Sequence, residues 1–289
     1  MKEHSNMERV LSTRVISICS LNHADVWKLT SRLLPKFVQA NEYVVYVPDN
    51  EIDSFLAITD SAINVLPQSN LGSAFASKLK NAMELSDNVQ RYGWYLQQFF
   101  KIEALLQAEA DYLVIWDADC VPVRKVKLFD ESGCPIYMRA HEYHQEYFFM
   151  IERLLGLSRI QNQSFVIPGF PISREWVRDF IRNLESRNGG LPWFDAIISC
   201  TNLSLQCGFS ETETLGTWIA NSYPDSWNTS ELAWERMGQS RFGFARNFTT
   251  DDVVTVGEKA NLDIISFENW DVRSARRTLR AVKDFLFRA

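Results

Sequence analysis

The sequence lacks the features that mark secreted, membrane-spanning and nucleic-acid-binding proteins. Its first apolar run, residues 15–21, is too short for a signal-peptide core or a membrane span. The five cysteines include no C-x-x-C pair, so neither a disulfide framework nor a zinc knuckle is indicated. Thirty Lys and Arg against 36 Asp and Glu give a net charge of −6, which leaves no basic excess for a phosphate backbone. We therefore expect a cytoplasmic protein with reduced thiols and no nucleic-acid partner.

Glycine and proline are also scarce, at 12 and 9 residues, and no repeat or Pro-, Gly- or Ser-rich linker divides the chain. Apolar residues make up 46% of the sequence and charged residues 23%, which is typical of a folded globular protein. We expect a single domain over residues 1–289. Residues 1–125 would form a nucleotide-binding half, and residues 126–289 an acceptor and specificity half.

Strand and helix patterns alternate in the first half of the chain. Strands are predicted at 14–20, 43–47, 63–66 and 112–116, and helices at 25–37 and 94–108. This alternation predicts an α/β fold whose mixed, mostly parallel sheet is flanked by helices. In such sheets ligands bind at the carboxyl ends of the strands. The second half is less regular, with strands predicted at 136–139, 164–167 and 253–256 and helices at 174–184, 211–220 and 271–287.

Two carboxylates, Asp117 and Asp119, directly follow the apolar strand 112–116. Leaving either one unpaired in the core would be costly, so both should face a cleft or a cation. Alternate residues of an extended segment point the same way, which lets the pair share Mg²⁺ or Mn²⁺ through oxygen. A cation there can bridge two phosphates of a nucleotide and neutralise a departing diphosphate. The alternative is a turn-forming pair that caps the next segment.

The order of these motifs resembles the GT-A class of nucleotide-sugar glycosyltransferases, in which a D-x-D motif ends a central strand. The resembling positions are Asn22, Asp49, the helix 93–101, Asp117, Asp119 and the segment 209–213. The chain is especially similar to bacterial GT-A-like proteins associated with surface polysaccharide, which carry a Tyr-Leu-Gln-Gln-type helix and a Phe-Ser-Glu-x-Glu segment. The resemblance implies metal-dependent transfer of a sugar from a nucleotide-sugar donor, with a UDP-sugar expected, to a glycan or lipid-linked acceptor.

The resemblance also implies donor-binding residues. By position, Asn22 and Asp49 would contact the base and ribose, although both residue types also cap helices and form turns. In the helix before the D-x-D strand, Trp94, Gln97, Gln98 and Lys101 form one polar stripe. We expect Gln97 and Gln98 to lie nearer the donor than Lys101, which sits roughly 10 Å beyond Trp94 at 1.5 Å per residue. A solvated stripe is the alternative.

The segment 208–218 resembles the place where inverting GT-A enzymes keep their catalytic carboxylate, at the start of a helix that lines the acceptor pocket. Such a base removes the acceptor hydroxyl proton as the oxygen attacks the anomeric carbon. Ser210 and Glu213 also fit a capping box, which would occupy Glu213 and leave Glu211 facing the cleft. We therefore rank Glu211 ahead of Glu213. If neither lay near the sugar, a retaining mechanism without a general base would fit better.

Aromatic and histidine-rich segments are the candidate acceptor contacts. His141 and His144 are three residues apart, so a metal pair on a helix is conceivable, but we expect them beside the sugar or acceptor, or His144 as a partly buried side chain. Loops 168–173 and 191–195, the latter with Trp193, would suit stacking on sugar rings, although buried aromatics are commoner. Many GT-A enzymes take a third metal ligand from a late histidine. None follows His144, so water or another acid would supply that position.

The chain's last segment, 271–288, has the pattern of a basic amphipathic helix. It could rest on anionic lipid at the inner face of the membrane, where a lipid-linked acceptor is found. Packing on the domain or on a second subunit is the preferred alternative.

Three other functions compete with the transferase. A haloacid-dehalogenase-like phosphatase would use Asp117 as nucleophile, but its motif opens the chain and has Thr where Val121 stands. A sugar nucleotidylyltransferase needs a Gly-rich loop after the first strand, where Cys19-Ser-Leu-Asn22 stands instead. A catalytically silent sugar-binding protein leaves the acids at 117, 119 and 211 without a purpose. Release of nucleotide with acceptor present would select the transferase, and release of phosphate from a phosphomonoester would select the phosphatase.

Overall fold

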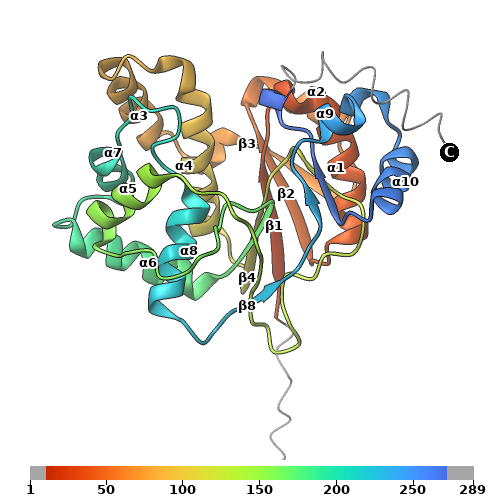
Figure 1. The fold of residues 1–289 in the computed structure, drawn as a ribbon. Helices are drawn as coiled ribbons and strands as arrows, with labels where there is room; N and C mark the ends of the chain where they lie inside the picture. The colour runs from red at the N-terminus through yellow and green to blue at the C-terminus, as the bar shows by residue number, and fades with distance from the viewer. Residues whose placement is uncertain (1–10, 272–289) are drawn as a thin grey trace, which may run out of the picture.

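The centre of the molecule is a five-stranded sheet, shown in Figure 1 by the computed structural model, which describes residues 11–271. The strand order is β3-β2-β1-β4-β7. The first four strands run parallel, and β7 runs antiparallel beside β4. The strands are β1 (Thr13–Ile18), β2 (Glu42–Val47), β3 (Ile63–Pro67), β4 (Tyr112–Trp116) and β7 (Gly169–Ser173). The predicted mixed, mostly parallel sheet is confirmed.

The inner strands read as nearly continuous apolar runs because helices cover both faces of the sheet. In β4, Leu113 to Trp116 are all buried. Two smaller sheets flank the large one. They consist of β5 (Cys120–Pro122), β10 (Ile264–Ser266) and β9 (Trp234–Glu235), and of β6 (Ile136–Met138) and β8 (Asn228–Ser230). Because β10 pairs antiparallel with β5, the segment after β10 lies next to the turn that follows β4.

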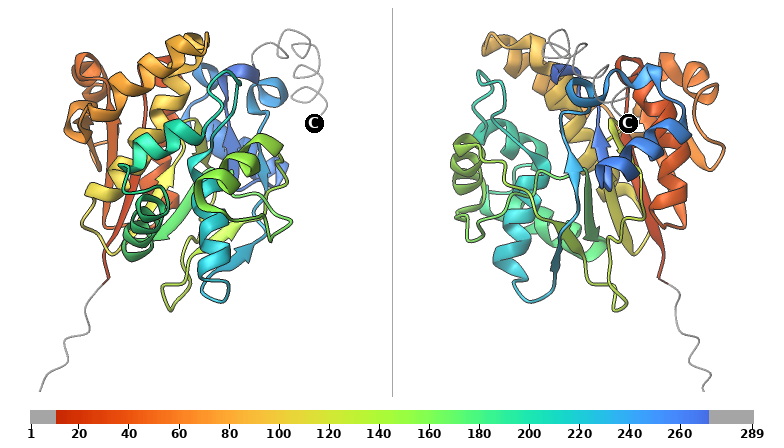
Figure 2. Two further views of the ribbon diagram at one scale, coloured as in Figure 1. Left: turned by 90° about the vertical axis from the view of Figure 1, so that its left-hand side faces the viewer. Right: turned by 45° about the vertical axis from the view of Figure 1, so that its right-hand side comes forward.

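Helices form two layers, one on each side of the sheet (Figures 1 and 2). One layer comprises α3 (Ala74–Leu85), α4 (Tyr92–Gln107), α5 (Gln145–Leu155), α6 (Arg174–Arg187), α7 (Trp193–Cys200) and α8 (Glu211–Ser222). The other comprises α1 (Ala24–Phe37), α2 (Ile52–Leu56), α9 (Gly238–Phe242) and α10 (Thr250–Ala260). Short 3-10 turns lie at Leu21–His23, Asp49–Glu51, Gln68–Leu71, Val89–Arg91, Ala245–Asn247 and Asn269–Asp271. In α8, every residue from Glu211 to Ala220 is buried.

Two predicted strands are wrong. Residues 253–256 lie inside helix α10, where a capping box of Thr249 and Asp252 starts the helix and Val253 faces the core. The cap and the single buried face outweigh the strand preference of a β-branched run. Residues 164–167 form only one bridge, between Ser164 and Ala140.

Both predicted aromatic loops belong to regular elements. Residues 169–173 form β7. Pro171 lacks a backbone N–H, and β7 tolerates it because this strand lies at the edge of the sheet, with no strand on its other side to receive a hydrogen bond. Trp193 begins α7. Within residues 11–271 no helix is long and apolar enough to cross a membrane. The predicted basic helix lies outside the described residues from 272 onward.

Candidate functional site

A cleft of about 880 Å³ opens at the carboxyl ends of β1 and β4. Its walls come from the segment after β1, the turn after β4, one face of α4, the loops that precede α5 and α8, and the segment after β10. The sheet topology thus gathers residues from across the chain at the edge where α/β proteins bind ligands.

Asp117 and Asp119 both line this cleft. They stand in a tight turn between β4 and β5, in which the Cys120 N–H donates to the Asp117 carbonyl at 3.0 Å. The Asp117 N–H donates to the Pro168 carbonyl at 2.9 Å. The assumed extended backbone is therefore wrong, since the acids form a turn, but the turn directs both carboxylates toward open space.

Lys101 joins the D-x-D turn to helix α8. Its Nζ lies 2.7 Å from Asp117 Oδ1 and 2.6 Å from Glu211 Oε1. Burial lowers the pKa of this ammonium, but the two carboxylates outweigh burial and raise the pKa above its usual value. Lys101 is therefore charged throughout the neutral range. We expected Gln97 and Gln98 to lie nearer the donor than Lys101, and the long side chain of Lys101 also reaches the cleft, beside Asp117 and Glu211.

Asp119 is the acid of this turn that has no cation beside it. In the part of the chain that the structure describes it forms no ion pair, and its side-chain contact is the Cys120 thiol at 3.6 Å. Burial and the neighbouring Asp117 raise the pKa of Asp119 to about 6, against the attraction of Lys101. A carboxylate that is partly withdrawn from water and lacks an ion-pair partner is a fitting ligand for a divalent cation.

The oxygen donors for such a cation are few. Asp119 offers its carboxylate, and Asp117 offers Oδ2, since Oδ1 is paired with Lys101. Glu268 brings a third carboxylate to the same end of the cleft, because the preceding Phe267 N–H donates to the Asp119 carbonyl at 2.9 Å. Residues 11–271 hold no preassembled group of three metal-ligating side chains. Mn²⁺ or Mg²⁺ would therefore bind through Asp119 and Asp117 and complete its shell with ligand oxygens or water.

The two glutamates of α8 point to opposite sides. Glu211 lines the cleft, and its backbone N–H donates to Gln98 Oε1 at 3.1 Å. Glu213 is 1% exposed and lies outside the cleft lining. Its carboxylate accepts from Ser164 Oγ at 2.6 Å and from the Phe165 N–H at 3.1 Å. Ser210 caps the helix, with the Glu213 N–H donating to its Oγ, but the reciprocal half of the capping box is absent because Glu213 turns to Ser164. The prediction of Glu213 as catalytic is wrong.

Of the predicted acceptor residues, the structure brings only His144 to the cleft. His141 is exposed outside it. Trp193 is 6% exposed and packs in an aromatic cluster with Phe75 and Phe99, at ring distances of 5.7 and 5.6 Å. The assignments of His141 and Trp193 to the acceptor site are wrong, and burial of a large aromatic ring in the core is the physical reason for the second.

The predicted donor residues divide in the same way. Asn22, Gln97 and Gln98 line the cleft. Asp49 does not; it is exposed, and its carboxylate accepts the Ser69 N–H at 3.1 Å. Hydrogen bonding by the Ser69 side chain and by this N–H lowers the pKa of Asp49. Asp49 therefore holds a turn, which was the alternative to a ribose contact.

With the geometry described, the chain can be compared with known proteins. A family model described as a family of unknown function, DUF6492, matches residues 21–230. The chain belongs to this family. No curated protein matches the sequence.

The DUF6492 match includes Lys101, Asp117, Asp119 and Glu211 but ends before another part of the cleft wall. Arg236 stands there, paired with Glu268 at 2.7 Å and with Glu142. Its guanidinium lies 5.6 Å from the ring of Trp234 and 5.8 Å from that of Trp270. Sequence reasoning missed Arg236, Glu142 and Glu268 because they come from distant loops with no motif. The ion pair of Lys101 could have been predicted, because Lys101 is a cation on an apolar helix that precedes a strand ending in two acids.

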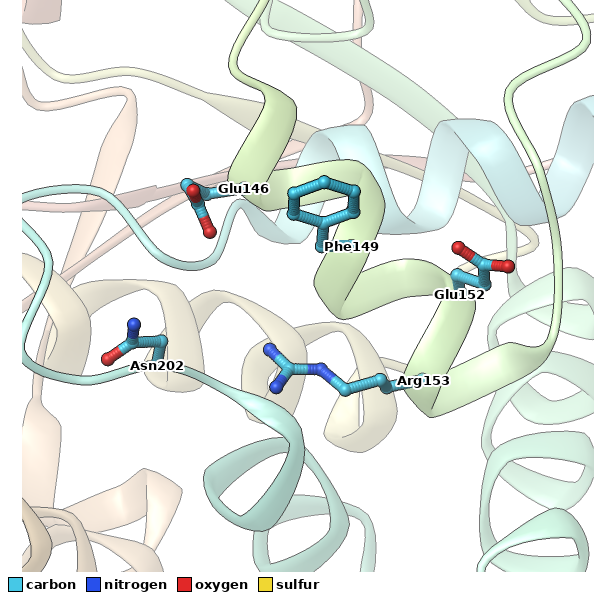
Figure 3. A pocket seen from close by; sticks show the side chains of 5 residues that line it. All are labelled: Glu146, Phe149, Glu152, Arg153 and Asn202. Atoms are coloured by element: carbon cyan, nitrogen blue, oxygen red, sulfur yellow. The ribbon is translucent and has the colours of Figure 1, made fainter.

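A second, shallower hollow of about 510 Å³ lies on the outer side of α5 (Figure 3). Its lining comprises Glu146, Phe149, Glu152, Arg153 and Asn202. Four of these residues belong to α5 and all except Asn202 come from its solvent-facing side, where Phe149 is 47% exposed. None of the charged residues that line this hollow is buried, whereas the cleft is lined by the buried Lys101 and Glu211.

Proposed function

We propose that this protein is a metal-dependent glycosyltransferase, which moves a sugar from a nucleotide-sugar to an acceptor hydroxyl. The observation that carries the proposal is Asp119, a half-buried carboxylate without an ion-pair partner among residues 11–271, beside Asp117 at the end of a central parallel strand and facing a large cleft. A diphosphate and a carboxylate pair repel one another, so a cation between them stabilises both.

Several other cleft residues have a place in this reaction. When bound, Mn²⁺ or Mg²⁺ supplies positive charge for the leaving diphosphate. Asp119 and Asp117 Oδ2 would hold the cation, and Asn22 and Gln97 offer hydrogen bonds to the donor. Gln98 is buried and its amide groups already bond to the Glu211 N–H and the Trp94 carbonyl, so it positions Glu211. We expect a UDP-sugar as donor and an inverting outcome.

Glu211 is the candidate base. Its Oε1 is held by Lys101 at 2.6 Å, and its Oε2 is left to accept a proton from the acceptor hydroxyl. Proton removal during attack on the anomeric carbon makes the acceptor oxygen a better nucleophile. The acceptor is a glycan or a lipid-linked saccharide, and the cytoplasm, at the inner face of the membrane, is the expected place for that chemistry.

Nucleotide binding tests the proposal directly. We expect UDP to raise the melting temperature only when Mn²⁺ is present, and Asp119→Ala to abolish that rise. Asp225→Asn, at an exposed loop position, is the matched control and should keep the response. A panel of nucleotides that leaves the melting temperature unchanged with either cation would overturn the proposal. Equal Mn²⁺ binding by Asp119→Ala would overturn the assigned cation site.

Glu211→Gln is expected to lower the turnover number about 10²–10⁴-fold while UDP and Mn²⁺ binding stay close to wild type. The amide keeps the size of the side chain but cannot take the acceptor proton. Glu213→Gln is the matched control two residues further along α8, because its carboxylate faces Ser164 instead of the cleft. Turnover with a sugar acceptor measures the effect. If both variants lost activity equally, Glu211 would not be the base.

The phosphatase alternative requires Asp117 to act as nucleophile. Because Asp117 Oδ1 is paired with the Lys101 ammonium, only Oδ2 would be available for that attack. Phosphate release from a phosphomonoester would support this alternative. A silent sugar-binding protein would bind the nucleotide-sugar but never release free nucleotide when acceptor is added.

A further inference from the structure

A thiol, an imidazole and a carboxylate form a continuous chain on the cleft wall. Cys207 Sγ lies 3.8 Å from His144 Nδ1, and His144 Nε2 lies 2.6 Å from Glu142 Oε1. The other carboxylate oxygen of Glu142 pairs with Arg236. All four side chains line the cleft. None of them has a role in the cation, donor or base assignments above.

The loop that carries Cys207 is held in place by buried contacts. The Gly208 N–H donates to the Tyr95 hydroxyl at 2.7 Å. A few residues earlier in the same loop, the carbonyls of Leu203 and Leu205 accept hydrogen bonds from Asn88 Nδ2 at 2.7 and 2.8 Å. Gly208 is required here, because a Cβ at this position would stand 2.5 Å from the Asn202 carbonyl oxygen. The thiol is therefore fixed in space relative to α4.

His144 is held equally firmly. It occupies the position just before α5, and its ring packs against Tyr147 at 4.9 Å between centroids. The carboxylate on Nε2 favours a proton on that nitrogen, which leaves Nδ1 free to accept the proton of the thiol. A nucleophile, a base and a group that orients the base are the three parts of an activated thiol.

We propose that Cys207 is a reactive thiol, activated by His144 and Glu142, that forms mixed disulfides with small-molecule disulfides entering the cleft. His144 Nδ1 accepts the thiol proton, and Cys207 Sγ attacks one sulfur of the disulfide. The sulfur–sulfur bond of the reagent breaks, a new bond joins its sulfur to Cys207, and the other half leaves as a thiolate that takes up a proton. No further oxidant is needed.

Other groups around the thiol do not compete for its proton. Tyr95 and Tyr147 face Cys207, and burial raises the pKa of both phenols, so they stay protonated at neutral pH. Glu211 is held by Lys101. Arg91, the cation next to this loop, donates to the Gln206 carbonyl at 2.9 Å.

The remaining cysteines lack this arrangement. Cys19 and Cys120 are buried, and burial raises the pKa of both thiols. Burial and Asp130 raise the pKa of Cys134. Cys200 is half-buried like Cys207 and packs against the core, and within residues 11–271 the one hydrogen-bond contact of its sulfur is the Ser199 hydroxyl, at 3.9 Å. Cys200 is thus an internal control of matched exposure.

The test uses the full chain with glutathione disulfide at pH 7, acid quenching at timed intervals, and peptide mass spectrometry. We expect Cys207 to acquire glutathione at least tenfold faster than Cys200, and a dithiol to remove it. His144→Gln should slow the reaction of Cys207 to the rate of Cys200 and leave Cys200 unchanged. Equal rates at the two cysteines of the wild-type protein would overturn the proposal, as would an unchanged Cys207 rate in His144→Gln.

Folding of the variant is checked in the same spectra. Modification of the buried Cys19 or Cys120 would show that the His144→Gln sample is unfolded. In that case the comparison of Cys207 with Cys200 in the wild-type protein alone tests the proposal. Glu142→Gln provides a second variant, which should give a rate between those of wild type and His144→Gln. These rates do not depend on a nucleotide-sugar, so their outcome is separate from that of the transferase proposal.

Discussion

Lys101→Met is expected to lower the free energy of unfolding by about 3–5 kcal/mol at neutral pH, which is the typical cost of removing one partner of a buried ion pair. The Lys101 side chain is 8% exposed and that of Glu211 is 5% exposed. No other cation within residues 11–271 contacts Glu211, so the variant leaves a buried carboxylate uncompensated. Urea unfolding followed by circular dichroism measures the loss.

Lys78→Met is the matched control for this variant. Lys78 pairs with Asp195 at 2.6 Å, the same distance, but its side chain is 54% exposed. An exposed pair contributes about 0–1 kcal/mol, so the control should be nearly neutral. Adding Glu211→Gln to Lys101→Met should restore part of the lost stability, because the uncompensated charge is removed. Equal losses for Lys101→Met and Lys78→Met would show that the buried triad contributes nothing special.

Asp119→Asn is expected to do the opposite, raising the free energy of unfolding by about 2 kcal/mol at pH 7.5 without metal. The folded-state pKa of Asp119 is about 6, above the ordinary 3.8, so ionising this group costs stability. The neutral amide avoids that cost. The same variant should lose the stabilisation that Mn²⁺ gives the wild-type protein, so stability and cation binding would change in opposite directions.

The pH dependence gives this prediction a distinctive form. A carboxylate with a raised folded-state pKa favours folding at low pH, and its cost appears as pH rises from about 4 through about 6. The gap between Asp119→Asn and wild type should therefore be full above pH 6 and shrink toward pH 4. Asp225→Asn, an exposed acid, should show no gap at either end. A destabilised Asp119→Asn at pH 7.5 would contradict the uncompensated charge inferred at this position.

Both predictions concern the same group of charges, which links helix α8 to the end of β4. Lys101 bridges Asp117 and Glu211, and Asp119 lies on the other side of Asp117. Three carboxylates and one ammonium leave a local excess of negative charge. A divalent cation or a cationic acceptor group would reduce it, which is the electrostatic basis of the proposed function.

Much of the fold was predictable because short-range patterns determine it. Strands near 14–20, 43–47 and 112–116 lie within two residues of the prediction, since nearly continuous apolar runs between helices can hardly form anything but the buried strands of a parallel sheet. Where one local preference opposed another, prediction failed. The run 253–256 favours a strand by residue type but lies in a helix through its cap and its single buried face.

The candidate site was predictable only in part. Asp117 and Asp119 could be predicted because they directly follow a buried strand, where an unpaired carboxylate would be costly. The sequence alone shows this position, so it indicates that both acids face a cleft or a cation. Glu211 was preferred over Glu213 on the assumption of a capping box. In the structure Glu211 lines the cleft and Glu213 does not. The reason differs from the assumed one, because the Glu213 carboxylate bonds to Ser164 and not to the helix cap.

By itself the sequence determined strands β1, β2 and β4, helices α1, α4, α6 and α8, and the acid pair at the carboxyl end of β4, since each depends on neighbours within a few residues. Only the tertiary structure decided which charges meet. The approach of Lys101 to Glu211 spans 110 residues, and that of Glu142 to Arg236 spans 94. Such contacts depend on how whole helices and loops pack, and no local pattern of residue types encodes that packing.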